Sequence, residues 1–189
     1  MRISKSKFVA GVQCLKRLYW QVHKPELPAE LDDSSESRIE QGREVGLLAR
    51  QLFPGGVEVD SSNGVEQAIR ATQELIANRE VPAIFEGTFE HQRVIVKTDI
   101  LQRRKENRWR LVEVKSIADL KNHHLEDVAI QSYVLSGSGL KLASIWLAHI
   151  NLWPQKGDSL DRNARHTAPS RWPKTCYAPL IVSVRPTAF

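Results

Sequence analysis

Cysteine is scarce in this sequence, which contains only Cys14 and Cys176 among its 189 residues. Two thiols are too few for a disulfide-stabilised scaffold or for a metal site made of four thiolates. The sequence also lacks an apolar run of the roughly 18 residues that cross a bilayer. Its basic N-terminus is not followed by the apolar segment and cleavage site of a secretory signal. We therefore expect a cytoplasmic protein that does not contact membranes.

The excess of positive charge is small and unevenly distributed. Lys and Arg number 27 against 22 Asp and Glu, so the formal net charge is +5. Residues 1–24 carry six basic and no acidic side chains, residues 25–66 three basic and ten acidic, and residues 155–189 six basic and two acidic. Because residues 155–189 alone supply +4, the net charge by itself does not indicate nucleic-acid binding.

The spacing of apolar residues predicts a chain of α/β class. With 41% hydrophobic residues, five Trp and five Phe, the chain is able to form a core, and its length suits one domain. Helical periodicity predicts helices over residues 4–23, about 33–53 and 65–78. Period-two alternation then predicts strands over 83–90, 93–101 and 110–115, followed by a helix over 123–135 and a strand over 142–150.

This order places a helical part in residues 1–80, a sheet core in residues 82–153, and together one domain over residues 1–154. After residue 154 the periodicity is lost, and we expect a loosely organised basic tail over residues 155–189. Residues 178–184 are compatible with one further short strand, although Pro179 and Pro186 flank it.

The sequence pattern that indicates chemistry is an Asp on the second predicted strand and Glu-x-Lys on the third. If the connection turns about Glu106, antiparallel pairing places Asp99 opposite Glu113, with Cβ atoms about 5 Å apart. Lys115 is two residues beyond Glu113 and emerges on the same face. Like charges directly opposite each other destabilise a sheet, so this arrangement favours a divalent cation between the carboxylates. A neighbouring Lys would stabilise the charge that develops on phosphorus during phosphodiester hydrolysis.

The alternative interpretation of these residues is an ordinary, half-exposed charged ladder. The pattern of an acidic residue, any residue and Lys is short, and Asp119-Leu120-Lys121 also matches it. That second match lies between a strand and a helix and has no preceding strand carboxylate at suitable spacing.

Several stretches together resemble the PD-(D/E)XK nuclease superfamily, within it the RecB-like and CRISPR-associated exonucleases and their uncharacterised bacterial relatives. The resemblance spans about residues 3–153, and no single motif in it is strong. The residues that carry it are 4–8, 14–18, 41–46, 52–56, 98–101, 112–116, 124–133 and 149–151. It implies a restriction-endonuclease-like αβββαβ core, with a mixed central sheet flanked by helices and an additional N-terminal helix.

The resemblance also implies roles for the residues of the pattern. Asp99 and Glu113 would hold Mg²⁺ or Mn²⁺, and Lys115 would assist the attacking water. A further acidic ligand often comes from the first core helix, where Glu40 or Glu44 is available; the alternative is a solvated helix face paired with arginines. Where RecB-like nucleases have a His in this helix, the chain has Gly46.

The helix after the third strand places further polar residues near the predicted site. His124, Asp127 and Gln131 share one helical face. The resemblance implies contact between Gln131 and nucleic acid, whereas His124 and Asp127 would support the site, as would Glu86 on the first strand. A two-residue turn at His91-Gln92 would set Glu86 diagonal to Asp99.

The predicted N-terminal helix has two interpretations. Its basic residues, with Tyr19 and Trp20 nearby, would suit the backbone of single-stranded nucleic acid, or the helix packs its apolar face on the core. The basic residues in question are Lys5, Lys7, Lys16 and Arg17.

Some RecB-like relatives bind an iron–sulfur cluster with one Cys before the nuclease core and three after it. Only Cys176 follows that core here, so this chain cannot supply four thiolates, and a cluster is not expected. Either the cluster is absent or the chain is a truncated form of a longer protein. We interpret Cys14 as a small buried residue.

These observations lead to two functional hypotheses. The first is a metal-dependent nuclease that hydrolyses phosphodiester bonds in DNA. The second is an inactive module of the same fold that binds nucleic acid or acts as a scaffold in a larger repair or defence complex.

Overall fold

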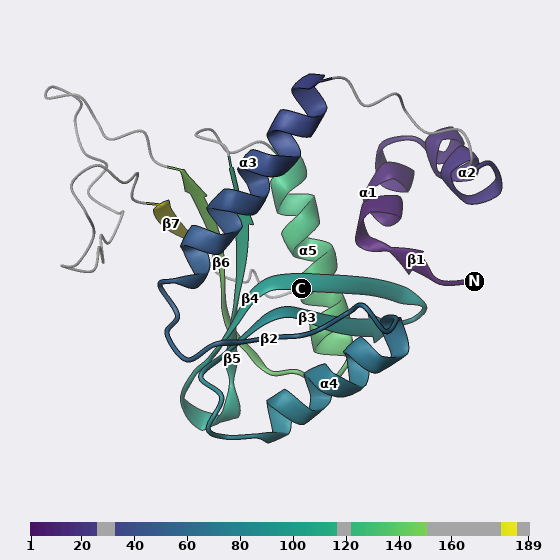
Figure 1. Ribbon diagram of the computed structural model, residues 1–189. Coiled ribbons are helices and arrows are strands. Elements are labelled where there is room, and N and C mark those ends of the chain that lie inside the picture. Colours follow the sequence, from purple (N-terminus) through teal and green to yellow (C-terminus); the bar gives the residue numbers. More distant parts are fainter. Residues whose placement is uncertain (26–32, 117–121, 151–178, 185–189) are drawn as a thin grey trace, which may run out of the picture.

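The chain forms an α/β structure around one mixed sheet, in a computed structural model that describes residues 1–25, 33–116, 122–150 and 179–184 (Figure 1). Its helices are α1 (Lys5–Gln13), α2 (Leu15–His23), α3 (Asp33–Arg50), α4 (Val65–Ala77) and α5 (Asn122–Gly137). Its strands are β1 (Ile3–Ser4), β2 (Val57–Glu58), β3 (Ala83–His91), β4 (Val94–Arg103), β5 (Trp109–Lys115), β6 (Leu142–Ile150) and β7 (Pro179–Val184). The strand order is β2-β3-β4-β5-β6-β7, and β1 pairs with β4.

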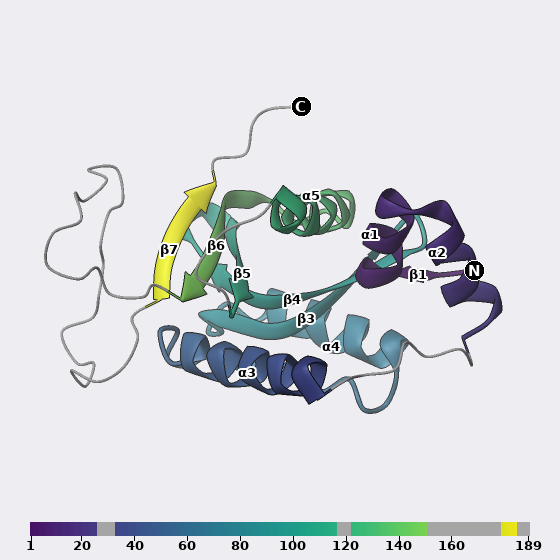
Figure 2. The same ribbon diagram turned by 90° about the horizontal axis from the view of Figure 1, so that it is seen from above.

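Helices cover both faces of this sheet (Figure 2). Leu111 of β5 packs in the larger core, to which α5 contributes, and the next residue, Val112, packs in a second core with Ala49 of α3. Successive strand residues point to opposite faces, so α5 and α3 lie on opposite sides of β5. Among the described helices, none is long and apolar enough to span a membrane.

From residue 83 to residue 150 the order of elements is the predicted one: an antiparallel β3-β4-β5 meander, a helix and the parallel strand β6. Strand β6 also has the predicted bounds. Three short elements were not predicted: β1, β2 and the 3₁₀ turn η1 (Lys105–Asn107). Within the stretch that we expected to be a loose tail, β7 pairs antiparallel with β6. The rest of that stretch, Cys176 and the second Asp-x-Lys match lie outside the described residues.

The single N-terminal helix that we predicted is wrong, because it is two helices. Cys14 between them has an extended backbone, with φ −162° and ψ 112°. Gly11 is buried where the two helices meet, and a Cβ atom there would lie only 2.8 Å from Cδ2 of Leu18. Cys14 itself is exposed, which also corrects our interpretation of it as a buried residue.

The register of β4 and β5 is the one that a turn about Glu106 predicts. Ile100 pairs with Val112 and Leu101 with Leu111, so continuing the ladder by one residue brings Asp99 opposite Glu113. The β3-β4 turn differs from the prediction by one residue, because His91 pairs with Val94 and the loop is Gln92–Arg93. Both loop residues have positive φ, of 47° and 66°.

This shifted turn places Glu86 directly opposite Asp99 rather than diagonal to it, since the flanking pairs are Phe85 with Ile100 and Gly87 with Thr98. The side-chain alternation changes at the same position. Ile84 and Phe89 both join the larger core, although strict alternation would put them on opposite faces. Glu86 has a φ of 55°, and this left-handed residue reorients the strand beside Asp99.

One end of the sheet is stabilised by the side chain of Arg103. The Arg103 guanidinium donates hydrogen bonds to four backbone carbonyls at the end of α4 and in the segment that follows it, those of Leu75, Ile76, Asn78 and Val81. It also lies 4.2 Å from the ring centroid of the buried Trp109. Arg103 therefore connects α4 to the β4-β5 hairpin.

Replacing Arg103 with Ala should lower the free energy of unfolding by about 2–3 kcal/mol, because several carbonyls lose their donor and Trp109 loses a packed neighbour. The neighbouring Arg104 is exposed, so Arg104→Ala should change stability by about 0.5 kcal/mol at most. Urea unfolding followed by Trp fluorescence measures both variants. Equal losses for the two would show that the Arg103 contacts do not stabilise the fold.

Candidate active site

Glu113 is the centre of the candidate site, and its side chain is only 2% exposed. Its Oε1 atom accepts hydrogen bonds from the Nζ atoms of Lys5 and Lys115, each at 2.9 Å. Its Oε2 atom accepts one from Nε2 of Gln131, at 2.5 Å. Burial raises the pKa of Glu113, but the positive charges of Lys5 and Lys115 outweigh that effect and hold the pKa below its usual value.

Lys115 is held between two carboxylates. Besides Glu113, its Nζ atom donates to Oδ2 of Asp127 in α5, at 2.6 Å. Burial lowers the pKa of Lys115, but these two carboxylates outweigh burial and raise the pKa above its usual value. Lys115 therefore remains a cation at neutral pH, so its ammonium group can donate hydrogen bonds but cannot accept a proton.

Lys5 reaches this site from the other end of the sequence. Strand β1 pairs in parallel with β4, with Ile3 opposite Val94, and α1 begins immediately after it. The Ser4 hydroxyl accepts a hydrogen bond from the backbone N–H of Lys7, at 3.4 Å, and so caps this helix. The strand-to-helix junction thus directs Lys5 towards Glu113, a contact that the sequence did not indicate.

Asp99 lies beside Glu113 and is partly exposed. Its Oδ2 atom accepts a hydrogen bond from the backbone N–H of Val114, at 2.6 Å. Burial and the negative charge of Glu113 raise the pKa of Asp99 to about 7, in spite of opposing contributions from Val114 and the two lysines. The predicted residues Asp99, Glu113 and Lys115 therefore form one cluster of interacting charges, to which the structure adds Lys5.

A cavity of about 290 Å³ opens beside Asp99 between α3 and the sheet. Glu86 and Glu58 line it on the sheet side, and both are ion-paired to Arg50 of α3, at 2.8 and 2.9 Å. Gly46 also lines the cavity. Because glycine has no side chain, this position supplies no ligand to the cavity.

Two neighbouring carboxylates, one of which has a raised pKa, are suitable donors for a divalent cation, since a cation would relieve their repulsion. Within the described residues, however, no three His, Cys, Asp or Glu side chains are grouped so as to hold a metal ion. Glu40 and Glu44 are exposed on α3, and neither lines the cavity. The two α3 carboxylates therefore do not complete a group of metal ligands with Asp99 and Glu113 in the part of the chain that the structure describes.

The remaining predicted residues are divided between the cluster and the surface. Gln131 is completely buried and bonds to Glu113, so in this structure it positions a carboxylate and does not face nucleic acid. His124 is buried on the same helix, and Asp127 contacts Lys115. Arg17 is exposed and donates to Gln13 of the preceding helix, away from the cluster. Lys7 is half-buried beside the start of α1.

Comparisons with other proteins leave the family open. No family model matches the chain, and no curated protein matches it. A solved structure titled "Crystal structure of SSO0001" is similar, with a TM-score of 0.45 and 13% sequence identity, over 80% of this chain and 63% of that one. A function for the chain therefore has to be inferred from its own site residues.

The raised pKa of Asp99 predicts a specific pH dependence of stability. A carboxyl group whose pKa is about 7 in the fold and 3.8 ordinarily binds its proton more tightly when folded, so its stabilising contribution is lost as the pH rises from about 4 to 7. Asp99→Asn removes this titrating group, so its stability relative to the wild type should increase as the pH rises from about 4 to 7. At pH 8 we expect the variant to be more stable than the wild type by about 2–4 kcal/mol. Urea unfolding in EDTA measures this difference, and parallel pH profiles for the two proteins would contradict it.

Proposed function

We propose that the chain is a metal-dependent nuclease of PD-(D/E)XK type that hydrolyses phosphodiester bonds in DNA. The observation that supports this most strongly is the burial of Glu113 beside Asp99, with Lys115 bonded to the same carboxylate. A buried charged cluster costs desolvation energy that apolar residues would avoid. Groups with perturbed pKa values next to a cavity are typical of catalytic sites.

In this proposal Asp99 and Glu113 hold the cation and Lys115 supplies a fixed positive charge. When bound, the divalent ion would polarise the phosphodiester and lower the pKa of a coordinated water. Asp127 and Glu113 fix the direction of the Lys115 ammonium group, and Gln131 fixes Glu113. Lys115 then stabilises the negative charge of the transition state, because its raised pKa keeps it protonated.

The second candidate function is an inactive module of the same fold that binds nucleic acid, in a repair or defence complex. One observation favours it: Glu113 already has two lysine partners, which would compete with a metal ion. A binding module requires only a basic surface, whereas an enzyme requires the carboxylates to bind a cation.

Cleavage of labelled single- and double-stranded DNA in Mg²⁺, Mn²⁺ or EDTA distinguishes the two functions. We expect metal-dependent cleavage that falls by about 10²–10³-fold in Asp99→Ala and in Lys115→Ala. Asp60→Ala, at an exposed position in a turn, should retain wild-type activity. Metal-dependent cleavage that survives both site substitutions would refute the site assignment. Salt-sensitive DNA binding without any cleavage would favour the inactive module.

Lys5 should oppose metal binding in the resting protein, because its positive charge lies 2.9 Å from the carboxylate that would hold the ion. Lys5→Ala should therefore lower the Kd for Mg²⁺ by about three- to tenfold. Lys7→Ala, two residues along the same helix, should leave the Kd unchanged. Isothermal titration calorimetry without DNA measures both variants, and an unaltered Kd in Lys5→Ala would show that Lys5 does not compete for the site.

A further inference from the structure

The β4-β5 hairpin forms a strongly basic end of the sheet. Backbone hydrogen bonds bring neighbouring segments to it: Trp109 donates to Lys141 O, and Arg103 donates to Pro82 O, in the segment that follows α4. The three segments 78–82, 102–110 and 140–142 contain seven basic and two acidic residues, a local charge of +5. We call this surface the basic end; its cations are Arg79, Arg103, Arg104, Lys105, Arg108, Arg110 and Lys141.

Two of these cations have structural partners. Arg103 is bonded to the backbone after α4, as described above. Arg110 donates to Ser144 and Gln102, and its guanidinium lies 3.4 Å from the ring centroid of Trp146. Neither side chain needs a partner outside the protein.

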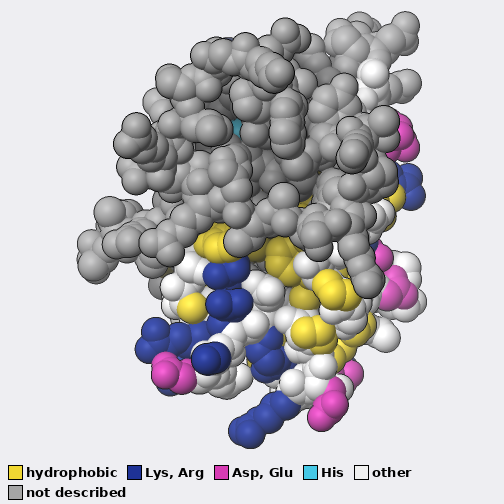
Figure 3. All heavy atoms as spheres, turned by 90° about the vertical axis from the view of Figure 1, so that its left-hand side faces the viewer, with side chains coloured by type: hydrophobic (Ala, Val, Ile, Leu, Met, Phe, Trp, Pro, Cys, Tyr) yellow, Lys and Arg dark blue, Asp and Glu magenta, His cyan; other side chains and the backbone are white. Residues whose placement is uncertain are grey.

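The other five cations are exposed. Figure 3 shows Lys and Arg side chains gathered on the lower part of the face that it presents. Arg108 pairs with Glu106, but this contact is long at 3.6 Å, and both side chains are more than half exposed. The cations also repel one another: burial and the charge of Arg104 lower the pKa of Arg110 to about 10, and burial and the charge of Arg79 lower that of Arg103. A polyanion would relieve this repulsion.

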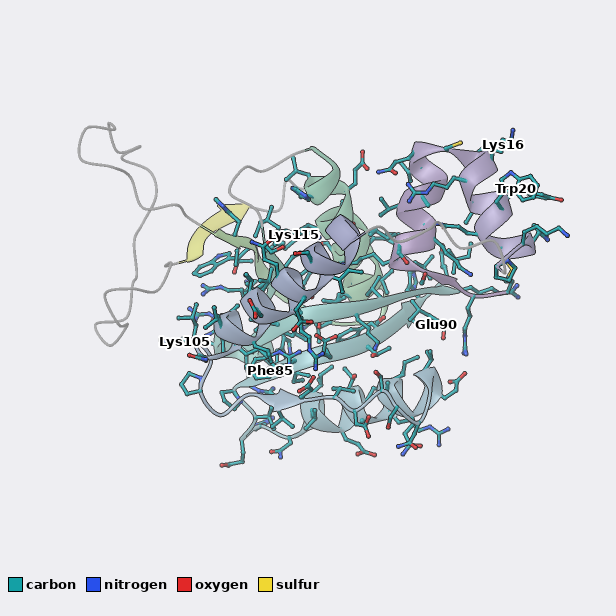
Figure 4. The ribbon with its side chains drawn as sticks, turned by 45° about the horizontal axis from the view of Figure 1, so that its top comes forward. Lys16, Trp20, Phe85, Glu90, Lys105 and Lys115 are labelled. Atoms are coloured by element: carbon teal, nitrogen blue, oxygen red, sulfur yellow. The ribbon has the colours of Figure 1, made fainter. Side chains whose placement is uncertain are left out.

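The basic end is separated from the candidate active site along one strand. From Arg108 to Glu113 is five residues, or about 17 Å of extended chain. Figure 4 labels Lys105 in the hairpin and Lys115 farther along the sheet. Phosphates on one DNA strand repeat about every 3.4 Å, so the separation corresponds to about five nucleotides of a duplex.

We propose that the basic end binds the phosphate backbone of a nucleic acid about five nucleotides from the Asp99–Glu113 site. This inference rests on the proposed function for the identity of the ligand but does not require cleavage. The hairpin presents Arg104, Lys105 and Arg108 around one 3₁₀ turn, so three cations lie within five residues of the chain. Contacts of this kind position the nucleic acid and carry no sequence preference.

The test is a fluorescence-anisotropy titration of a labelled 24-base-pair duplex in EDTA, where no cleavage takes place. Arg104→Glu/Lys105→Glu should raise the Kd at least tenfold at 0.1 M salt and reduce the slope of log Kd against log salt by about 2. The matched control is Arg70→Glu/Lys97→Glu, which changes the net charge equally at exposed positions on α4 and β4. The control should weaken binding less than threefold.

Equal weakening by both double variants would overturn the inference, since net charge alone would then explain binding. A wild-type protein that binds no DNA, or a hairpin variant that binds like the wild type, would also overturn it. Competition by polyglutamate as effective as by unlabelled duplex would indicate an acidic protein partner instead. Loss of binding in the hairpin variant, in a wild-type protein that never cleaves, would support the basic end while refuting the nuclease proposal.

Discussion

The burial of the Glu113 carboxylate constrains much of the surrounding structure. A carboxylate that is 2% exposed must be paired and hydrogen-bonded, or it would be neutralised. Its hydrogen-bond and ion-pair partners are Lys5 of α1, Lys115 of β5 and Gln131 of α5. The N-terminal segment, a central strand and a covering helix are therefore joined through one side chain.

This constraint explains features that would otherwise be unrelated. The two-residue strand β1 is too short to be stable alone, but it fixes the point at which α1 starts and hence the position of Lys5. The Asp99 carboxylate accepts a hydrogen bond from the Val114 backbone, whereas the Glu113 carboxylate is bonded to two lysines, and the pKa of Asp99 rises while that of Glu113 falls. Two neighbouring carboxylates thus have opposite pKa shifts, so that near neutral pH one exchanges protons while the other stays ionised.

The sequence predicted the local geometry of the site better than its long-range contacts. Once the turn is taken to centre on Glu106, the approach of Asp99, Glu113 and Lys115 follows from strand periodicity, which is a local property. The break at Cys14 could not be predicted, because the apolar spacing continues across it. The Gln92–Arg93 turn has no Gly or Asn to indicate its positive φ values. Lys5 contacts a residue 108 positions away, which no periodicity encodes.

The negative charge of the candidate site and the positive charge of the basic end lie in different parts of the sheet. With Asp99 ionised, the site cluster has three carboxylates, from Asp99, Glu113 and Asp127, against two lysines, so it remains slightly negative and attractive to a cation. The basic end carries +5, as much as the whole chain. At physiological salt the Debye length is about 8 Å, so charges about 17 Å along the sheet are strongly screened from the site. In contrast, a nucleic acid that extends over both the candidate site and the basic end would contact the cations of the basic end directly. On the proposed function, cations at this distance would attract a polyanion without adding to the competition that Lys5 and Lys115 already exert at Glu113.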